Sequence, residues 1–142
     1  MKKIHALKNK TLIVGCGRLG ASIANECSAE GKNIMAIDIN EACFDGLSKD
    51  FSGYTFVGDC TDLSLLEEAY ITSAKEIIIT TGNDNINLFV AYVARKIYDV
   101  PNIYVRLDDP TNATLLQGMK IKAIYPFELS FDKFNLIRGG SK

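Results

Sequence analysis

A chain of 142 residues is long enough for one globular domain, and its 47% hydrophobic and 23% charged residues argue against disorder. The 16 Lys and Arg residues nearly balance the 17 Asp and Glu residues, so the net charge of −1 gives no bulk attraction to nucleic acid or anionic lipid. No apolar run approaches the roughly 18 residues of a membrane span, and the basic start MKKIHALKNK lacks the apolar stretch of a signal peptide.

Six short apolar runs alternate with helix-like segments along the chain. They cover residues 11–15, 33–38, 54–58, 76–80, 102–106 and 122–126. Such runs, several of them rich in Ile and Val, are typical of strands buried on both faces of a parallel sheet.

The clearest helix is expected over residues 84–98, with Asn83 as its N-cap. Its apolar face would comprise Ile86, Phe89, Val90, Val93 and Ile97. Strands that alternate with helices predict an α/β fold with right-handed crossovers. We expect a doubly wound, Rossmann-like parallel sheet of about six strands with helices on both faces, which uses nearly the whole chain.

The segment TLIVGCGRLGASIA places Gly15, Gly17 and Gly20 between the first expected strand and a helix. In this context GxGxxG is typical of dinucleotide binding. Gly15 would permit a tight turn, Gly17 would let the backbone approach a phosphate, and Gly20 would let the helix pack on the sheet. The N–H groups of the helix start would then face the anion. The alternative is that the glycines serve packing alone.

Asp38 ends the second expected strand, where a carboxylate can accept hydrogen bonds from both ribose hydroxyls. The alternative is an N-cap for a helix that begins at Asn40 or Glu41. An acid here repels a 2′-phosphate, and no Arg or Lys immediately follows it. The sequence therefore favours NAD(H) or a simple adenine nucleotide, and not NADP.

Polar residues also follow the third and fourth expected strands, whose carboxyl ends lie at the same edge of the sheet. Asp59 could accept a hydrogen bond from an adenine amino group, whereas Asp62 is better placed to cap the next helix. The segment TTGNDNIN, residues 80–87, offers hydroxyls, a glycine and N–H groups at another helix start. Half of its polar residues could serve capping alone.

Two arginines accompany these segments. Arg18 would stand at a helix N-terminus, where a cation is unfavourable with the helix dipole, which suggests a nearby anion. Arg106 ends the fifth expected strand and could reach the same crevice or pair with Asp108 or Asp109.

The four cysteines, Cys16, Cys27, Cys43 and Cys60, have no CxxC spacing, and His5 is the single histidine. A zinc site is therefore not expected, and no metal ligand is predicted. We expect reduced, mostly buried thiols. A redox-sensing role for Cys16, inside the glycine segment, is the alternative.

In order, the strings GCGRLG, GDCTD, TGNDNINL and VRLDDPTNATLLQGMKIKAIYP, with Asp38 after the first, resemble the RCK or KTN (TrkA N-terminal) domain family. The resemblance runs from about Thr11 to the C-terminus. It implies a cytoplasmic regulatory domain that senses NAD(H) or ATP/ADP. It also implies a homodimer that assembles into an octameric ring on an integral membrane potassium transporter or channel subunit, at the inner face of the membrane.

By matching position, the resemblance gives these cofactor-binding residues: Gly15, Gly17, Arg18, Leu19, Gly20, Asp38, Ile39, Asp59, Cys60, Thr80, Thr81, Gly82, Asn83 and Arg106. Arg18 and the segment 80–83 would meet phosphates, Asp38 the ribose, and Asp59 with Cys60 the adenine. Many relatives place an acid directly after the proline that ends the last strand. Here Phe127 follows that proline, and the acid comes one position later.

Three parts of the chain are expected: an N-terminal extension over 1–10, a Rossmann-like lobe over 11–126, and a C-terminal helix and tail over 127–142. In PFELSFDKFNLI the prolyl residue Pro126 suits a first helical turn. Phe127, Phe131 and Phe134 share one face, whereas leucines lie on another. A helix that is apolar on more than one side favours a homodimer contact over docking on its own core.

No catalytic residue is predicted. Hydride transfer needs a substrate pocket and a proton donor beside the nicotinamide, but the expected sheet uses most of the chain, and His5 precedes the first strand. No nucleophile–base pair stands out. We therefore expect a sensor, not an enzyme. The alternatives are a small NAD-dependent oxidoreductase and a passive assembly domain with a structural nucleotide.

Overall fold

A computed structural model describes residues 4–139, which form one six-stranded parallel sheet. Its strands are β1 (Lys10–Val14), β2 (Asn33–Asp38), β3 (Tyr54–Val57), β4 (Ala74–Ile79), β5 (Asn102–Arg106) and β6 (Lys122–Ile124). The order across the sheet is β3-β2-β1-β4-β5-β6, the doubly wound Rossmann order. All six predicted strands are confirmed, with small differences at their ends.

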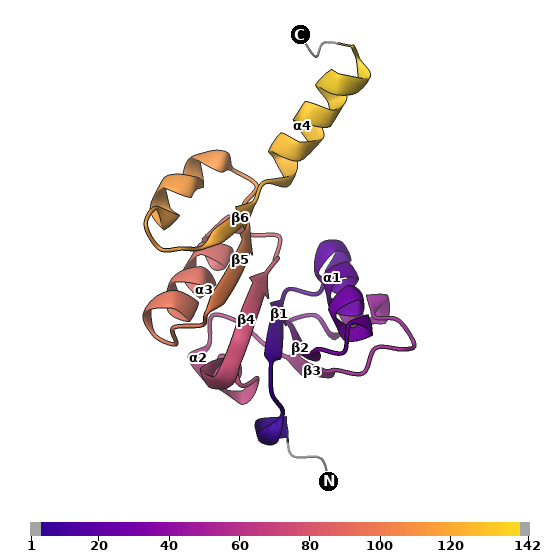
Figure 1. Ribbon diagram of the computed structural model, residues 1–142, viewed down its shortest axis with the longest axis vertical. Helices are drawn as coiled ribbons and strands as arrows, with labels where there is room; N and C mark the ends of the chain where they lie inside the picture. Colours follow the sequence, from indigo (N-terminus) through magenta and orange to yellow (C-terminus); the bar gives the residue numbers. More distant parts are fainter. Residues whose placement is uncertain (1–3, 140–142) are drawn as a thin grey trace.

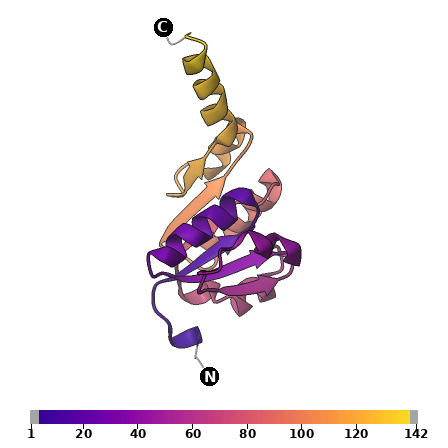
Figure 2. The ribbon, with the colours of Figure 1, turned by 90° about the vertical axis from the view of Figure 1, so that its right-hand side faces the viewer.

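Helices cover both faces of this sheet (Figures 1 and 2). The α-helices are α1 (Arg18–Ala29), α2 (Leu63–Glu68), α3 (Asp84–Lys96) and α4 (Pro126–Ile137). Short 3-10 helices are η1 (Ile4–Ala6), η2 (Glu41–Gly46), η3 (Ile71–Ser73) and η4 (Pro110–Leu116). None of the helices in residues 4–139 is both long and apolar enough to cross a bilayer.

Hydrophobic clusters form on both faces of the sheet because successive strand residues point to opposite faces. Leu12 lies in the larger core with the buried residues of α2 and α3, whereas its neighbour Ile13 packs with Ala24 and Cys27 of α1. All five residues of β1 are buried, since β2 and β4 flank it and helices cover both faces.

The predicted N-cap of α3 is confirmed: Asn83 Oδ1 accepts a hydrogen bond from Ile86 N at 3.0 Å. The predicted apolar face of α3 is partly wrong, because Phe89 and Ile97 are 42% and 57% exposed. The buried stripe instead comprises Asn87, Leu88, Val90, Ala91, Val93 and Ala94. The small alanines let the helix approach the sheet closely, which turns Phe89 outward, and Ile97 lies beyond the end of the helix.

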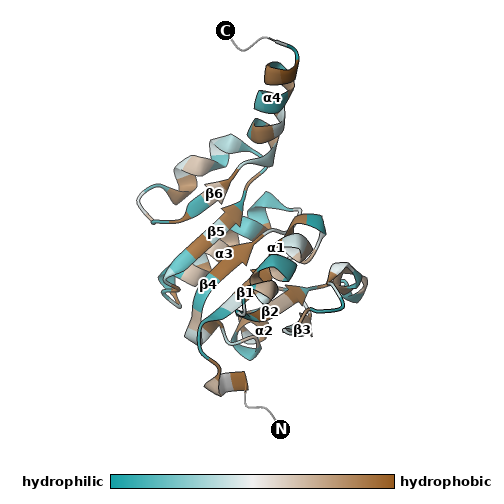
Figure 3. Cartoon of the chain, turned by 45° about the vertical axis from the view of Figure 1, so that its right-hand side comes forward, coloured by the Kyte–Doolittle hydropathy of each residue, from teal (hydrophilic) through white to brown (hydrophobic). Residues whose placement is uncertain are grey.

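Helix α4 begins at Pro126 as predicted and extends away from the sheet (Figure 1). None of its residues is buried. The Phe127 and Phe131 rings stack with centroids 6.1 Å apart, yet both side chains are more than half exposed. Apolar residues recur along the whole helix (Figure 3). Docking of α4 on its own core is therefore wrong for the single chain. Residues 1–3 and 140–142 of the predicted extension and tail lie outside the described residues.

Candidate functional site

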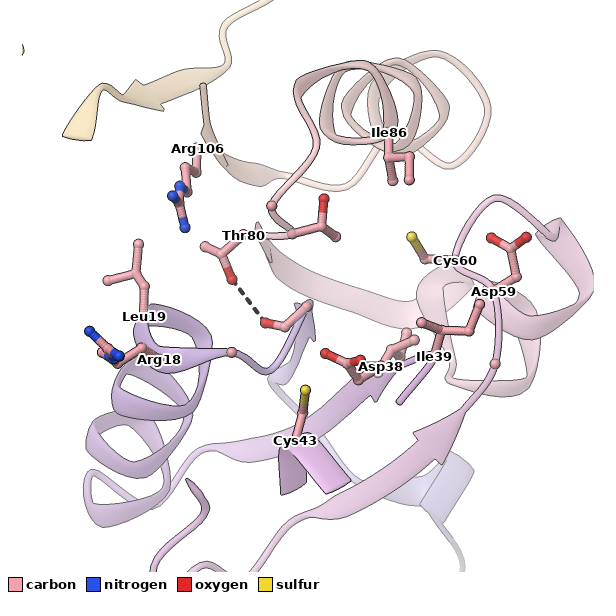
Figure 4. Close-up of a pocket in the computed structure, with 16 residues that line it drawn as sticks. Arg18, Leu19, Asp38, Ile39, Cys43, Asp59, Cys60, Thr80, Ile86 and Arg106 are labelled. Carbon is pink, nitrogen blue, oxygen red and sulfur yellow. Dashed lines mark hydrogen bonds between the residues drawn. The ribbon is translucent and has the colours of Figure 1, made fainter. Parts of the chain in front are cut away.

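A cavity of about 390 Å³ opens at the carboxyl ends of the strands (Figure 4). Chain order in the sheet reverses between β1 and β4, and open α/β sheets bind ligands at such a point. The volume is within the range of roughly 300–1,000 Å³ found for small-molecule sites. The Thr80 hydroxyl donates to the Gly15 carbonyl at 2.9 Å and so joins the ends of the two central strands beneath the cavity.

Most of the predicted site residues line this cavity: Gly15, Gly17, Arg18, Leu19, Asp38, Ile39, Asp59, Cys60, Thr80, Thr81, Gly82 and Arg106. Gly20 and Asn83 are not among its lining residues. Gly20 packs beneath the glycine loop, and the Asn83 side chain caps α3. The role of each lining residue as a ligand contact stays a prediction.

The three glycines of the loop differ in what surrounds them. Gly15 has φ +95°, and a Cβ there would lie 2.7 Å from Thr81 N, so turn and close approach both require glycine. A Cβ on Gly20 would lie 1.9 Å from the Gly15 oxygen. A Cβ on Gly17 would meet nothing within 4 Å. Packing thus accounts for Gly15 and Gly20 but not for Gly17, which faces open space at the cavity.

The start of α1 offers free N–H groups to this space. The first N–H groups of a helix have no intrahelical partner and carry partial positive charge. Asp62 caps α2, as predicted, through Ser64 N at 2.9 Å, and Asn83 caps α3. The N-cap of α1 is Gly17, which has no side chain that could accept hydrogen bonds from the N–H groups of the helix. Among these three helix starts, the α1 terminus is therefore the one whose N–H groups no side chain caps, so they remain open to an anion.

Two guanidinium groups stand on one side of the cavity, with Leu19 between them (Figure 4). Arg18 is exposed, and no acidic side chain among residues 4–139 forms an ion pair with it. Arg106 Nε donates to Asp108 Oδ1 at 3.1 Å while the side chain also lines the cavity. The arrangement therefore gives one unpaired and one paired arginine beside the open end of α1.

Asp38 joins the glycine loop to the end of β2. Its Oδ2 accepts from Cys16 N at 2.7 Å, and its Oδ1 accepts from Asn40 N at 2.8 Å. The N-cap of η2 is Asn40, which accepts from Ala42 N, so the N-cap alternative for Asp38 is wrong. Each carboxylate oxygen can accept a second hydrogen bond, which leaves capacity for ribose hydroxyls.

The Asp59 carboxylate lies at the opposite side of the cavity, near Ile39 and Cys60 (Figure 4). Its Oδ1 accepts from Thr61 N at 2.9 Å and from the Thr61 hydroxyl at 2.8 Å. These hydrogen bonds hold the pKa of Asp59 below its usual value. Asp59 is therefore a fixed, ionised acceptor at neutral pH.

All four cysteines are free, as predicted, and Cys16, Cys27 and Cys60 are buried. Burial, with the nearby Asp38 and Cys43, raises the pKa of Cys16 to about 11. Burial and the adjacent carboxylate of Asp59 likewise raise the pKa of Cys60 to about 11. Little thiolate forms at neutral pH, which disfavours a redox-sensing role for Cys16. No group of His, Cys, Asp and Glu within the described part of the chain could hold a metal ion.

Sequence reasoning missed four lining residues: Ile37, Cys43, Gly58 and Ile86. Gly58 follows β3 at the same edge as Asp59, so the rule for strand ends could have found it. Cys43 and Ile86 lie on η2 and in the first turn of α3. Their positions depend on how these helices fold back over the strand ends, for which no local pattern exists.

The TrkA-N domain family model matches residues 11–126. The Trk system potassium uptake protein TrkA of Streptomyces coelicolor is 32% identical over 113 residues, which cover 80% of this chain and 51% of the relative. Potassium channel protein 1 of Methanocaldococcus jannaschii is 36% identical over 131 residues, covering 89% of this chain and 39% of the relative. The chain thus spans about half of these relatives or less.

Solved structures of the GsuK channel share the fold. The structure bound to NAD has a TM-score of 0.72 at 15% identity and covers 91% of this chain and 23% of the channel chain. The structure bound to ADP has a TM-score of 0.69 at 16% identity, and the match covers 84% of this chain and 32% of the GsuK chain. The match of the family model over most of the sequence, on this sheet order, shows that the chain belongs to the TrkA-N domain family.

Proposed function

We propose that this chain is a regulatory domain that senses NAD(H) or ATP/ADP and controls a membrane potassium transporter or channel. The observation that carries the proposal is the start of α1: Gly17 leaves its N–H groups uncapped, and the unpaired Arg18 stands beside them. Both features favour a phosphate. The names of the potassium uptake and channel relatives support a role in potassium transport, and the NAD- and ADP-bound GsuK structures support the ligand class.

The ligand carries a free ribose 2′-hydroxyl under this proposal. Asp38 can accept from ribose hydroxyls but would repel a 2′-phosphate. NADPH would also bring its additional charge near Asp59, which is ionised at neutral pH. We therefore expect NAD(H), ATP and ADP to bind, and NADP(H) to bind more weakly.

The proposal includes no enzymatic step. The two carboxylates at the cavity, Asp38 and Asp59, already accept hydrogen bonds from backbone N–H groups and so help to position the backbone. An exchange of nucleotides would instead favour one arrangement of subunits, which requires different affinities for the two arrangements. The small oxidoreductase alternative would need a general acid or base beside the nicotinamide, and the described residues that line the cavity include no His, Lys or Tyr.

The partners would be a second copy of the chain, further copies in a ring, and a membrane potassium transport subunit on the cytoplasmic side. The exposed aromatic residues Phe127, Phe131 and Phe134 of α4 support pairing with a second copy, because the chain's own sheet leaves them uncovered. On α3, Phe89 and Tyr92 are also exposed and offer a second apolar contact for ring assembly.

A thermal-shift titration of NAD⁺, NADH, NADPH, ATP and ADP tests the ligand assignment. We expect concentration-dependent stabilisation by NAD⁺, NADH, ATP and ADP, a weaker effect of NADPH, and a much smaller effect of each nucleotide on the Arg18→Gln variant. Lys49→Gln is the control, because Lys49 is exposed, does not line the cavity and makes no side-chain hydrogen bond or ion pair among the described residues. If none of the five nucleotides stabilised the wild-type chain, the proposal would be wrong. A nucleotide that copurified and resisted exchange would indicate the passive structural alternative.

Small-angle scattering tests the sensor function itself. We expect a dimer in solution whose scattering profile differs between ATP, ADP and NADH. Superimposable profiles with each nucleotide and without any would contradict a mechanism that works through subunit geometry.

A further inference from the structure

The side chain of Asn87 is fully buried in α3, and all of its hydrogen-bonding capacity is used. Its Oδ1 accepts from Thr81 N at 3.2 Å and from the Thr81 hydroxyl. Its Nδ2 donates to the Thr81 carbonyl at 3.0 Å and to the Arg106 carbonyl at 2.8 Å. One buried amide thus joins the segment that follows β4 to the end of β5.

A second link lies one turn earlier on the same helix. Asp84 Oδ1 accepts from Asp108 N at 2.8 Å, and Asp84 Oδ2 accepts from Asp109 N at 2.9 Å. Asn112 Nδ2 donates to the same Oδ2 at 3.0 Å. Asn87 and Asp84 together therefore fix the backbone on both sides of Leu107. The fixed segment continues into η4.

This segment leads directly to the base of α4. Arg106 pairs with Ile124 in the parallel register of β5 and β6, and Leu107 N donates to the Ile124 carbonyl at 2.9 Å. Tyr125 follows β6 and is the N-cap residue of α4. A shift of the segment 80–82 at the cavity would thus reach α4 through Asn87, the end of β5 and β6.

We propose that Asn87 is the positioning residue that couples occupancy of the cavity to the base of α4, with Asp84 as a second link. This proposal rests on the proposed nucleotide-sensing function. Thr81 and Gly82 line the cavity from one side of the Asn87 amide, and Arg106 lines it from the other. A phosphate contact that displaces either the Thr81–Gly82 segment or Arg106 would also displace the other, because both are hydrogen-bonded to Asn87. Breaking either hydrogen bond would leave a buried polar group unsatisfied. A shift at its base would move helix α4 as a whole, because none of its residues is buried in the chain's own core.

Hydrogen exchange of backbone amides in the full 142-residue chain, with and without saturating ATP, tests the coupling. In the wild type we expect ATP to slow exchange about fivefold or more at residues 122–125, which do not themselves line the cavity. In Asn87→Leu, ATP still binds at the untouched start of α1 and protects residues 17–20, but the protection at 122–125 is lost. Asn85→Leu is the matched control, because Asn85 is exposed on the same helix and makes no side-chain hydrogen bond among the described residues.

The comparison separates coupling from simple structural support. A merely structural Asn87 would change exchange at 122–125 equally with and without ATP, and the ATP-dependent difference would survive. Survival of that difference in Asn87→Leu would overturn the proposal. Should this variant not fold, Asp84→Asn, which keeps the side-chain shape, is expected to reduce the ATP-dependent difference at 107–112, and an unchanged difference would overturn the proposal. ATP binding without remote protection in the wild type would overturn the coupling alone, whereas absence of any nucleotide binding would overturn the proposed function with it.

Discussion

Replacing Asp38 with alanine separates two roles of one carboxylate. The variant removes the acceptor for Cys16 N and for Asn40 N. Asn40 is exposed, so water can replace that bond, but Cys16 is 1% exposed and its N–H would be left without a partner. An unsatisfied buried donor costs about 1–3 kcal/mol. For a domain of this size, that loss lowers Tm by roughly 3–10 °C.

The same substitution removes the proposed ribose contacts. Hydrogen bonds to a charged group contribute about 1.5–3 kcal/mol, which corresponds to a roughly 10- to 150-fold loss of affinity. We expect this loss for both NADH and ATP, because each presents ribose hydroxyls. Differential scanning fluorimetry gives Tm, and isothermal titration calorimetry of the folded variant gives Kd.

Asp50→Ala is the control, since Asp50 is an exposed acid for which the structure shows no side-chain hydrogen bond. It should change neither Tm nor Kd. A variant Asp38→Ala that was destabilised but bound both nucleotides with unchanged Kd would refute the ribose assignment. An unchanged Tm would refute the reasoning about the buried Cys16 N–H.

Three further predictions concern the packing of the glycine loop, the reactivity of the cavity thiols and the pH dependence of stability. Gly20→Ala places a Cβ 1.9 Å from a backbone oxygen and should lower the free energy of unfolding by several kcal/mol, whereas Gly82→Ala, whose Cβ meets nothing within 4 Å, should leave it unchanged in urea titrations without ligand. Cys60 is buried and its pKa is about 11, so at pH 8 it should be alkylated more slowly in the folded state than the partly exposed Cys43. Because Cys43 lines the cavity, ATP should slow its labelling, which mass spectrometry can follow. Burial raises the pKa of Asp84, but the hydrogen bonds that it accepts from backbone N–H groups outweigh burial and lower the pKa below 3.8. Asp84→Asn should therefore reduce Tm at pH 7, and the difference in Tm from the wild type should shrink as the pH falls below 3.8. An equal difference at every pH would contradict this assignment.

The strands and the glycine loop were predictable because their signals are local. An apolar run of Ile and Val between turns specifies a buried strand, and the position of Asp38 follows from the end of such a run. The face of α3 was less predictable: Phe89 fits the helical period of an apolar stripe, but the close approach of Ala91 and Ala94 to the sheet decides which stripe is buried.

The buried amide of Asn87 illustrates the other limit. In sequence it is one polar residue among several in TGNDNINL, and nothing local distinguishes it from the exposed Asn85. Its partners are Thr81, six positions earlier, and Arg106, 19 positions later. Only the packing of α3 on the ends of β4 and β5 brings them together.

Gly17 makes stability and recognition opposing requirements at the start of α1. Its φ of −74° and ψ of −155° already match an N-cap conformation, and a Cβ there would meet no atom within 4 Å. A serine could therefore cap the helix and stabilise the empty domain by about 0.5–2 kcal/mol relative to an uncapped terminus. That hydroxyl would occupy the N–H groups that a phosphate needs. Gly17 leaves the start of the helix without a side-chain cap. Under the proposed function, the phosphate of the ligand would complete that cap.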